Sequence, residues 1–266
     1  MTVTVGFLLG RHPSGVSVLA EVFEILHRAG VGVSTWVCRA DAAVPEELRG
    51  ARVVAVRQPG LHGVAVARRL EGAGARCCNT AEATARASDK GAVLEALTRA
   101  GVPVPPSVIL PTWAEARRAA ALGPVVAKAL DGTGGMGVLL AERHGLPERA
   151  PFPGPYLLQE RLAHPGPDRK VFVIGGAVWG VLRPWPASGL SDKLGQAFDP
   201  TPDEVAVATR AGSALGLDVY GVDLVPTGDG PVVVDVNPFP GFKGVDGAAS
   251  ALAAHLAALA RAEAAL

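Results

Sequence analysis

The sequence is poor in cysteine, in net charge and in long apolar runs, and each shortage argues against a class of protein. Only 3 of its 266 residues are cysteines. Cys38, Cys77 and Cys78 lack metal-ligand spacing, and two adjacent cysteines are poorly placed to bridge each other. We therefore expect no disulfide framework, and a reducing, cytoplasmic location.

The missing net charge and the missing long apolar runs argue against two kinds of partner. The 25 basic and 25 acidic residues cancel, so the chain as a whole is not drawn to nucleic acid or to a membrane surface. No apolar run approaches the length that crosses a bilayer, and the N-terminus lacks the pattern of a signal peptide. An anionic ligand must therefore be held locally.

Strands alternate with helices over the first third of the chain. The pattern predicts strands at Thr2–Leu9, Val31–Cys38 and Val53–Val56, with helices at Ser14–Ala29 and Leu61–Gly74. Such alternation favours a small, mostly parallel α/β domain. Three loop residues after its strands are candidates for binding a substrate, although such side chains are more often only solvated: His12, Arg57 and His62.

A helix is predicted from Asp89 to Ala100, with Ser88 as its N-cap and Gly101 as its end. Lys90 then lies in the first turn, where the helix dipole disfavours a cation by up to about 1 kcal/mol. A bound anion would reverse that preference, and Asp89 would offset it without a ligand. Two later helices begin at capping boxes, Thr112 to Glu115 and Thr201 to Glu204.

Gly132, Gly134 and Gly137 form a G-x-G-x-x-G string, which occurs in several unrelated contexts. Here Val138–Leu140 continues as a strand, so the glycines are predicted to cap a hairpin of the kind that covers nucleotide phosphates. No Gly-Lys-Ser/Thr follows, which excludes a P-loop. Lys128 precedes the glycines among apolar neighbours and needs a partner, either a phosphate or, on an edge strand, water.

Two further polar groups follow the glycine-rich hairpin. The strand Tyr156–Leu162 contains Gln159-Glu160 near its end. Backbone groups there could contact an adenine edge, and Glu160 or a neighbour could hold ribose hydroxyls. Lys170, Arg183 and Lys193 then form a second group of cations. Surface charge would account for any one of them, but together they indicate a place where negative charge develops during phosphoryl transfer.

Tyr220–Gly241 is predicted to form two strands joined by a glycine-containing turn. With Gly228–Gly230 as the loop, Thr227 pairs with Pro231 and Val225 with Val233, and Asp223 lies opposite Asp235. Like charges in that position destabilise a sheet, and Asn237 points from the same face. We predict that these hard oxygen donors bind Mg²⁺, or Mn²⁺ in its place. The alternative is a structural hairpin with solvated carboxylates.

The order of these elements resembles the ATP-grasp superfamily over residues 85 to 245, approximately. It is similar to the RimK-type amino-acid ligases, the lysine-biosynthesis ligases and the inositol trisphosphate 5/6-kinases. The resemblance implies an α/β (α+β) chain with an ATP-grasp fold and an N-terminal Rossmann-like α/β domain. Its implied limits are 1–85 for that domain and 86–266 for the ATP-grasp domain, divided into subdomains near 106–162 and 163–266.

The resemblance also implies roles for individual residues. Asp223, Asp235 and Asn237 would bind magnesium, although Asp235 stands where such ligases usually carry Glu. Arg183, Lys170 and Lys193 would stabilise the transferring phosphoryl group or an acyl phosphate. The remaining residues would contact ATP: Lys90, Lys128, Gly132, Thr133, Gly134, Gly135, Gly137, Gln159, Glu160, Arg161 and Leu162.

The implied activity is ATP-dependent ligation of a small-molecule carboxylate to an amine, with amino acids or a peptide as substrates. The strings Lys170–Val173 and Phe239–Gly241 also resemble the kinases, so an ATP-dependent kinase acting on an inositol phosphate or another polyol is the alternative. A non-catalytic nucleotide-binding module is a third hypothesis. Ligases of this type are often dimers or tetramers, so a homo-oligomer is compatible with the resemblance.

Overall fold

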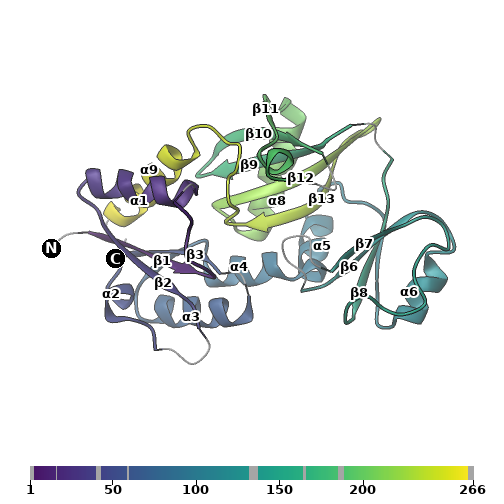
Figure 1. Cartoon of the computed structure of the whole chain (residues 1–266), viewed down its shortest axis with the longest axis horizontal. Helices are drawn as coiled ribbons and strands as arrows, with labels where there is room; N and C mark the ends of the chain where they lie inside the picture. Colours follow the sequence, from purple (N-terminus) through teal and green to yellow (C-terminus); the bar gives the residue numbers. More distant parts are fainter. Residues whose placement is uncertain are drawn as a thin grey trace.

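In a computed structural model of the protein, the described residues form three β-sheets (Figure 1). The structure describes residues 3–15, 17–39, 43–58, 60–131, 137–163, 166–184 and 189–262. Its mixture of helices and sheets agrees with the predicted α/β (α+β) class. Within the described ranges, no helix is both long enough and apolar enough to cross a membrane.

The first sheet is parallel, with strand order β2-β1-β3-β4. Its strands are β1 (Thr4–Leu9), β2 (Gly32–Val37), β3 (Val53–Arg57) and β4 (Arg76–Cys78), and its helices are α1 (Val18–Arg28), α2 (Glu46–Arg49) and α3 (Leu61–Gly72). This arrangement confirms the predicted strand–helix alternation. Crossover helices bury β1 and β3 on both faces, which is why these strands are almost continuously apolar.

The second sheet is antiparallel, with strand order β5-β8-β6-β7. Its strands are β5 (Ser107–Leu110), β6 (Val125–Ala129), β7 (Val138–Ala141) and β8 (Tyr156–Glu160). The helix α6 (Trp113–Ala119) packs on it and begins at the predicted capping box of Thr112 and Glu115. This sheet lies at the opposite end of the molecule from the N-terminus (Figure 1).

The third sheet has strand order β11-β10-β9-β12-β13. Its strands are β9 (Asp168–Ile174), β10 (Ala177–Arg183), β11 (Gln196–Phe198), β12 (Val219–Thr227) and β13 (Gly230–Pro238). The short helix α7 (Leu190–Leu194) lies between β10 and β11 in sequence. The longer α8 (Pro202–Leu215) packs on the sheet, and it begins and ends as predicted, at the Thr201–Glu204 capping box and at left-handed Gly216.

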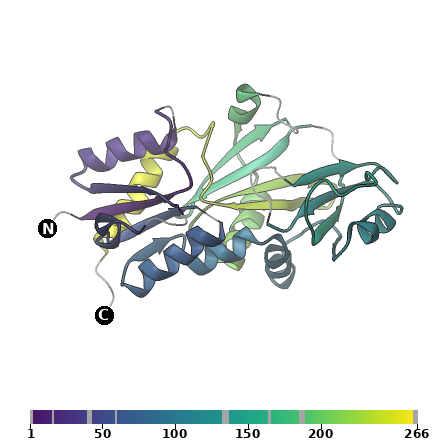
Figure 2. The same ribbon diagram turned by 60° about the horizontal axis from the view of Figure 1, so that its bottom comes forward.

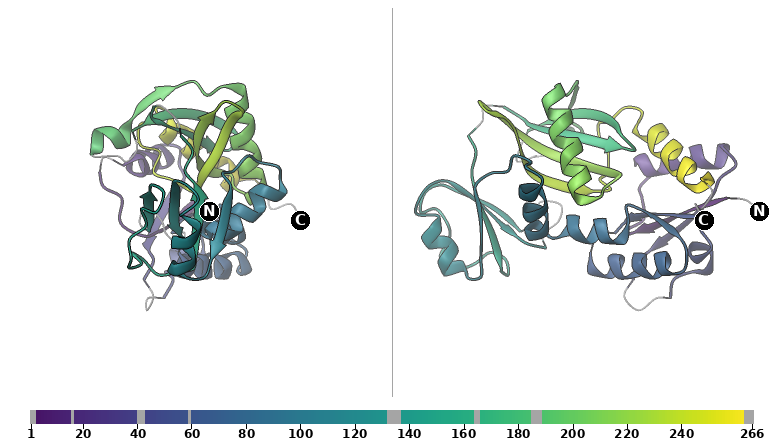
Figure 3. Two further views of the ribbon diagram at one scale, coloured as in Figure 1. Left: turned by 90° about the vertical axis from the view of Figure 1, so that its right-hand side faces the viewer. Right: turned by 180° about the vertical axis from the view of Figure 1, so that it is seen from behind.

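In the described part of the chain, α4 (Ala81–Ser88) and α5 (Lys90–Arg99) lie between the first and second sheets, and α9 (Ala248–Arg261) follows the last strand. In Figure 2, α4 continues from the first sheet toward the other two. Seen from behind, α9 returns to lie beside α1 (Figure 3). Leu252 and Leu256 of α9 are fully buried in one core with Val22 and Leu26 of α1, so the last helix packs against the start of the chain.

The start of α5 differs from the prediction. Asp89, not Ser88, is the N-cap, because the Asp89 carboxylate accepts hydrogen bonds from the backbone N–H groups of Gly91 (2.7 Å) and Ala92 (3.1 Å). Ser88 ends α4 instead, and its hydroxyl donates to the carbonyl oxygen of Thr84 at 2.6 Å. Lys90 is therefore the first residue of α5. Asp89 places a negative charge beside it, as in the alternative in which no bound anion is needed to offset the helix dipole.

Candidate active site

The hairpin of β12 and β13 brings Asp223 opposite Asp235, but by a different register from the predicted one. Thr227 pairs with Gly230 rather than Pro231, and Val225 pairs with Val232 rather than Val233. The loop is therefore one residue shorter than predicted. A bulge between Asp223 and Leu224 leaves Val234 as an extra residue on β13, and it restores the pairing of the two aspartates.

The two carboxylates and Asn237 project from one face, as predicted from their spacing. The Asn237 side-chain amide lies 3.5 Å from Oδ2 of Asp223 and 3.3 Å from Oδ2 of Asp235. In this arrangement the amide NH₂ donates toward both acids. Because an amide can present either its nitrogen or its oxygen, turning it over would place three oxygen donors together.

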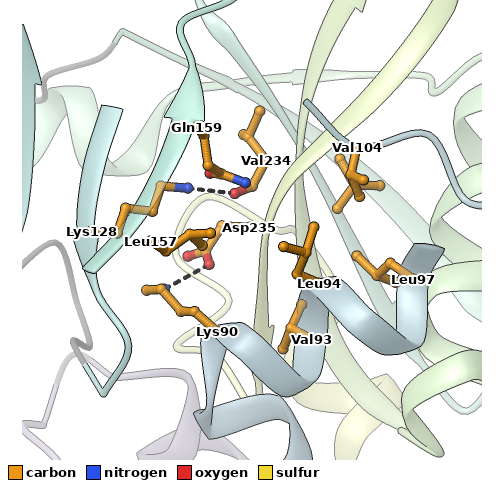
Figure 4. Close-up of a pocket in the computed structure, with 11 residues that line it drawn as sticks. Lys90, Val93, Leu94, Leu97, Val104, Lys128, Leu157, Gln159, Val234 and Asp235 are labelled. Carbon is orange, nitrogen blue, oxygen red and sulfur yellow. Dashed lines mark hydrogen bonds and ion pairs between the residues drawn. The ribbon is translucent and has the colours of Figure 1, made fainter. Parts of the chain in front are cut away.

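Lysine side chains offset the repulsion between the aspartates. Lys170 on β9 forms an ion pair with Asp223, and Lys90 at the start of α5 donates to Oδ1 of Asp235 at 2.9 Å (Figure 4). Burial alone would raise the pKa of Asp235, but the charges of Lys90 and Lys128 outweigh it and lower that pKa. From the sequence, a divalent cation was expected to provide this compensation. Among the described residues, protein cations contribute to it, and the divalent cation stays a prediction.

Lys128 is held on an interior strand, so the edge-strand alternative is wrong. β6 lies between β8 and β7, and Lys128 is 7% exposed. Its ammonium group donates to the carbonyl oxygen of Val234 at 2.7 Å, the residue that the bulge leaves outside the regular pairing (Figure 4). Burial lowers the pKa of Lys128, and the charge of Asp235 acts against that shift. A buried ammonium group therefore lies beside the face of the hairpin that carries Asp223, Asp235 and Asn237, the acidic face.

A pocket lies between the second sheet, α5 and the bulge of β13. Lys90, Lys128, Gln159 and Asp235 contribute its polar lining (Figure 4). Its apolar lining was not identified from the sequence, because those side chains are ordinary core residues until α5 is placed: Val93, Leu94, Leu97, Val104, Leu157 and Val233. The structure thus brings together four of the predicted site residues from four different elements.

The end of β8 and the two residues after it place their side chains in different surroundings. Gln159 is 6% exposed, and its amide donates to the hydroxyl of Ser107 at 3.1 Å. Glu160 is exposed, Leu162 is half-buried, and Arg161 forms an ion pair with Glu142 away from the pocket lining. Of these four predicted nucleotide contacts, only Gln159 lines the pocket.

The glycine-rich segment joins β6 to β7, as predicted, and does not open a helix. Lys128 pairs with Val138 in an antiparallel ladder. Gly137 has a positive φ of 71°, and a Cβ atom there would lie 2.8 Å from Cβ of Ala129, so glycine fits this close approach. Four predicted phosphate contacts lie outside the described residues: Gly132, Thr133, Gly134 and Gly135.

Arg183 lies at the end of β10, close to the acidic face. Its guanidinium group donates to the carbonyl oxygen of Lys243 and lies 5.4 Å from the centre of the Phe172 ring. Burial lowers its pKa, and the charge of Asp223 opposes that shift, which indicates that the two groups interact. Lys193 belongs to α7, but its side chain is outside the described part of the chain.

One of the three loop candidates of the first sheet reaches this region. A Cβ atom at Gly241, which follows β13, would lie 3.4 Å from Nη2 of Arg57. Burial and the nearby charge of Arg11 both lower the pKa of Arg57. His12 is exposed, and the imidazole of His62 contacts the carbonyl oxygen of Arg39 at 2.9 Å. Arg57 is the last residue of β3 rather than a loop residue, because the strand extends one position beyond the predicted end at Val56, and it faces the segment after the hairpin of β12 and β13.

Comparison with known proteins identifies the arrangement. Residues 87–259 match the model of the RimK-like ATP-grasp domain. The chain belongs to the RimK-like ATP-grasp family. A relative from Picosynechococcus sp., named a probable alpha-L-glutamate ligase, is 34% identical over 208 residues. That match covers 70% of this chain and 66% of the relative, so the chain spans about two thirds of the relative's length.

Two solved structures share the ATP-grasp fold over nearly the whole chain. The RimK domain ATP-grasp protein from Sphaerobacter thermophilus has a TM-score of 0.73 and 25% identity, covering 97% of this chain and 99% of its own. The ATP-grasp ligase PsnB, solved with a minimal precursor, Mg and ADP, has a TM-score of 0.70 and 21% identity, covering 97% of both chains. These matches confirm the predicted ATP-grasp fold.

Proposed function

We propose that this ATP-grasp protein is an ATP-dependent carboxylate–amine ligase that forms an amide through an acyl phosphate and releases ADP and phosphate. The observation that supports it most strongly is the shared face of Asp223, Asp235 and Asn237, opposed by Lys90 and Lys128 across the pocket. The family match and the ligase names of the relatives favour ligation over the kinase and non-catalytic alternatives.

The donor set of the acidic face fits a divalent cation. Two carboxylates and one amide oxygen are the hard ligands that Mg²⁺ or Mn²⁺ takes, with water and phosphate oxygens completing the coordination. Asp223, Asp235 and Asn237 would hold the ion after the Asn237 amide turns its oxygen toward it. Bound there, the cation would neutralise phosphate charge and help to position the triphosphate.

Lys90 and Lys128 are proposed to bind the ATP phosphates. Both ammonium groups already line the pocket, where they contact Asp235 and the Val234 carbonyl. Phosphate oxygens are stronger partners for a buried ammonium than a single backbone carbonyl, because both members of the pair are then charged. We assign the adenine and ribose contacts to the chain at Gln159–Leu162, of which Gln159 lines the pocket and the other three would have to contact ATP outside its present lining. We assign the cover over the phosphates to residues 132–137.

In the first step, an oxygen of the substrate carboxylate attacks the γ-phosphorus of ATP, and the bond to the ADP oxygen breaks. In the second step, the amine nitrogen attacks the carbonyl carbon of the acyl phosphate, phosphate leaves, and the amine loses a proton. Arg183, Lys170 and Lys193 would stabilise the negative charge that develops on the transferred and leaving groups. The enzyme's contribution is thus mainly positioning and charge stabilisation.

We place the acceptor beside residues 241–243, between Arg57 and Arg183. Arg57 lies against Gly241, and Arg183 donates to the carbonyl oxygen of Lys243. Two guanidinium groups on either side of this segment suit an acceptor that carries a carboxylate, such as an amino acid or a peptide.

The test is ADP release measured with purified protein, MgATP and a panel of amino acids and amines. The proposal predicts ADP release that requires a carboxylate and an amine together, with a new amide detected by mass spectrometry. Turnover with a polyol alone would support the kinase instead. Nucleotide binding without turnover on any substrate pair would support a non-catalytic module.

A further inference from the structure

A cysteine, an aspartate and a histidine converge where the first sheet, the third sheet and the last helix meet. Their potential ligand atoms, the Cys78 thiol, an Asp218 carboxylate oxygen and an imidazole nitrogen of His255, all lie within 4.8 Å of one another. Cys78 ends β4, Asp218 precedes β12, and His255 lies in α9. Residues far apart in sequence form this group, so their spacing along the chain does not reveal it.

The His255 ring has a polar atom without a partner. Nε2 is buried and has no hydrogen-bond partner among the described residues. A buried polar atom of this kind loses its interactions with water and needs a replacement. A metal ion bound to an imidazole nitrogen would provide one.

The backbone around the cluster is shaped and held in place. A Cβ atom at Gly175, whose φ is 56°, would collide with the His255 imidazole, so glycine leaves room for the ring. The Asn79 side chain accepts hydrogen bonds from the backbone N–H groups of Asp218 (2.8 Å) and Val219 (2.9 Å). The carbonyl oxygen of Asp218 accepts a hydrogen bond from the backbone N–H of Gly175 at 2.9 Å. Asp218 is therefore fixed from both sides.

The donor types select the kind of metal. Sulfur, imidazole nitrogen and carboxylate oxygen together suit Zn²⁺ and related transition-metal ions, whereas Mg²⁺ takes oxygen ligands. Cys78 is fully buried and Asp218 is exposed, so an ion would enter from the Asp218 side. Arg76 is also near, but its side chain is exposed, and solvent weakens its repulsion of a cation.

We propose that Cys78, Asp218 and His255 bind one Zn²⁺ ion, with water as the fourth ligand. The site is separate from the acidic hairpin, because Asp218 precedes Asp223 by five residues of extended chain, about 16 Å. Zinc would join β4, the start of β12 and α9, and so fasten the last helix to both flanking sheets. Binding requires the thiolate, so it would release the Cys78 proton.

Co²⁺ is the most direct probe, because a cobalt–thiolate bond gives a charge-transfer absorption that oxygen ligands do not. The 266-residue chain without a tag would be stripped with a chelator, supplied with excess Mg²⁺ and titrated with Co²⁺ and then Zn²⁺. We expect one equivalent of Co²⁺ to produce the thiolate band and Zn²⁺ to displace it. Zn²⁺ should also raise the melting temperature.

Matched variants assign the band to this cluster. Cys78→Ser should abolish it, and Asp218→Asn, which alters an exposed side chain, should weaken Co²⁺ binding at least about tenfold. Cys77→Ser is the control, because the neighbouring thiol faces the carbonyl oxygen of Ala67 at 3.8 Å in a different core cluster. Absence of the thiolate band from the parent protein, or its survival in folded Cys78→Ser, would overturn the proposal. If Cys78→Ser does not fold, unchanged affinity in Asp218→Asn would overturn it as well.

Discussion

Lys90 and Asp235 form an ion pair at 2.9 Å although 145 positions separate them in the sequence. The pair joins the first residue of α5 to the middle of β13, and its side chains are 15% and 31% exposed. Both residues are proposed to act on ATP, one through phosphate and the other through the metal. Binding of ATP with its metal would therefore replace the Lys90–Asp235 ion pair with a Lys90–phosphate contact and an Asp235–metal contact.

Replacing Lys90 by methionine should weaken ATP binding, because a charge-assisted contact to phosphate is lost. Such contacts contribute about 1.5–3 kcal/mol, which corresponds to roughly a 10- to 150-fold increase in the KM for ATP. Arg99→Met is the control on the same helix, since Arg99 pairs only with the exposed Glu95 among the described residues. Equal KM values for ATP in the two variants would contradict the assignment of Lys90.

Asp235→Asn should reduce turnover by at least about 100-fold, because one ligand of the proposed metal loses its charge. The free energy of unfolding should also fall, because the neighbouring lysines favour the charged carboxylate in the folded state. Asp229→Asn, in the exposed hairpin turn, should retain activity. Steady-state kinetics and chemical denaturation measure both quantities, and an active Asp235→Asn enzyme would exclude this ligand role.

Gly137→Ala should raise the KM for ATP without abolishing folding. The added methyl group would lie 2.8 Å from Cβ of Ala129, and the positive φ of 71° adds strain, so the hairpin over the proposed phosphate site must shift. Gly228→Ala is the control in the other hairpin, where a Cβ atom meets no atom within 4 Å. Identical ATP kinetics in both variants would argue against a role for the hairpin geometry.

Glu204 provides a pH-dependent test of stability away from the proposed catalytic site. It is 4% exposed, pairs with Arg169 and accepts a 2.8 Å hydrogen bond from the backbone N–H of Thr201. Burial would raise its pKa, but the Arg169 and Thr201 contacts outweigh this and lower it. Glu204→Gln keeps the capping geometry but loses the charge, and should cost about 1–3 kcal/mol at neutral pH.

The direction of the Glu204 effect with pH follows from its lowered pKa. The carboxylate's contribution to the free energy of unfolding is complete above its usual pKa of 4.5 and is lost as the pH falls through the folded-state pKa. The difference between wild type and Glu204→Gln should therefore shrink in acid. Glu95→Gln, whose side chain is 69% exposed, should show little difference at any pH. A Glu204→Gln effect that is constant down to acid pH would contradict this explanation.

The sequence patterns predicted which side chains share a face of the hairpin better than they predicted its register. Alternation placed Asp223, Asp235 and Asn237 on one face, because side-chain direction has a period of two residues. The loop length and the bulge at Val234 were not predicted. The shorter loop shifts the strand pairing by one residue and the bulge shifts it back, so Asp223 still lies opposite Asp235. A bulge depends on what contacts the freed backbone group, here Lys128, and that contact comes from another sheet.

Non-local packing explains the other differences. Ser88 and Asp89 are both good N-cap residues, and the choice depends on α4, a helix that was not predicted. Lys128 is interior because β8, later in the chain, pairs with β6. The Cys78 cluster has no local signature at all, since its three members come from separate elements. Local patterns therefore predicted many of the elements but not α4, whereas tertiary pairing determined the surroundings of the side chains.

Calorimetric titration of a non-hydrolysable ATP analogue, with Mg²⁺ and with chelator, tests most directly whether the β12–β13 hairpin holds a metal-bound triphosphate. Wild type should bind at least about tenfold more tightly with Mg²⁺, equivalent to about 1.4 kcal/mol, and folded Asp235→Asn should lose that gain. Equal affinity with and without Mg²⁺ in the wild type, or an undiminished gain in Asp235→Asn, would contradict the account.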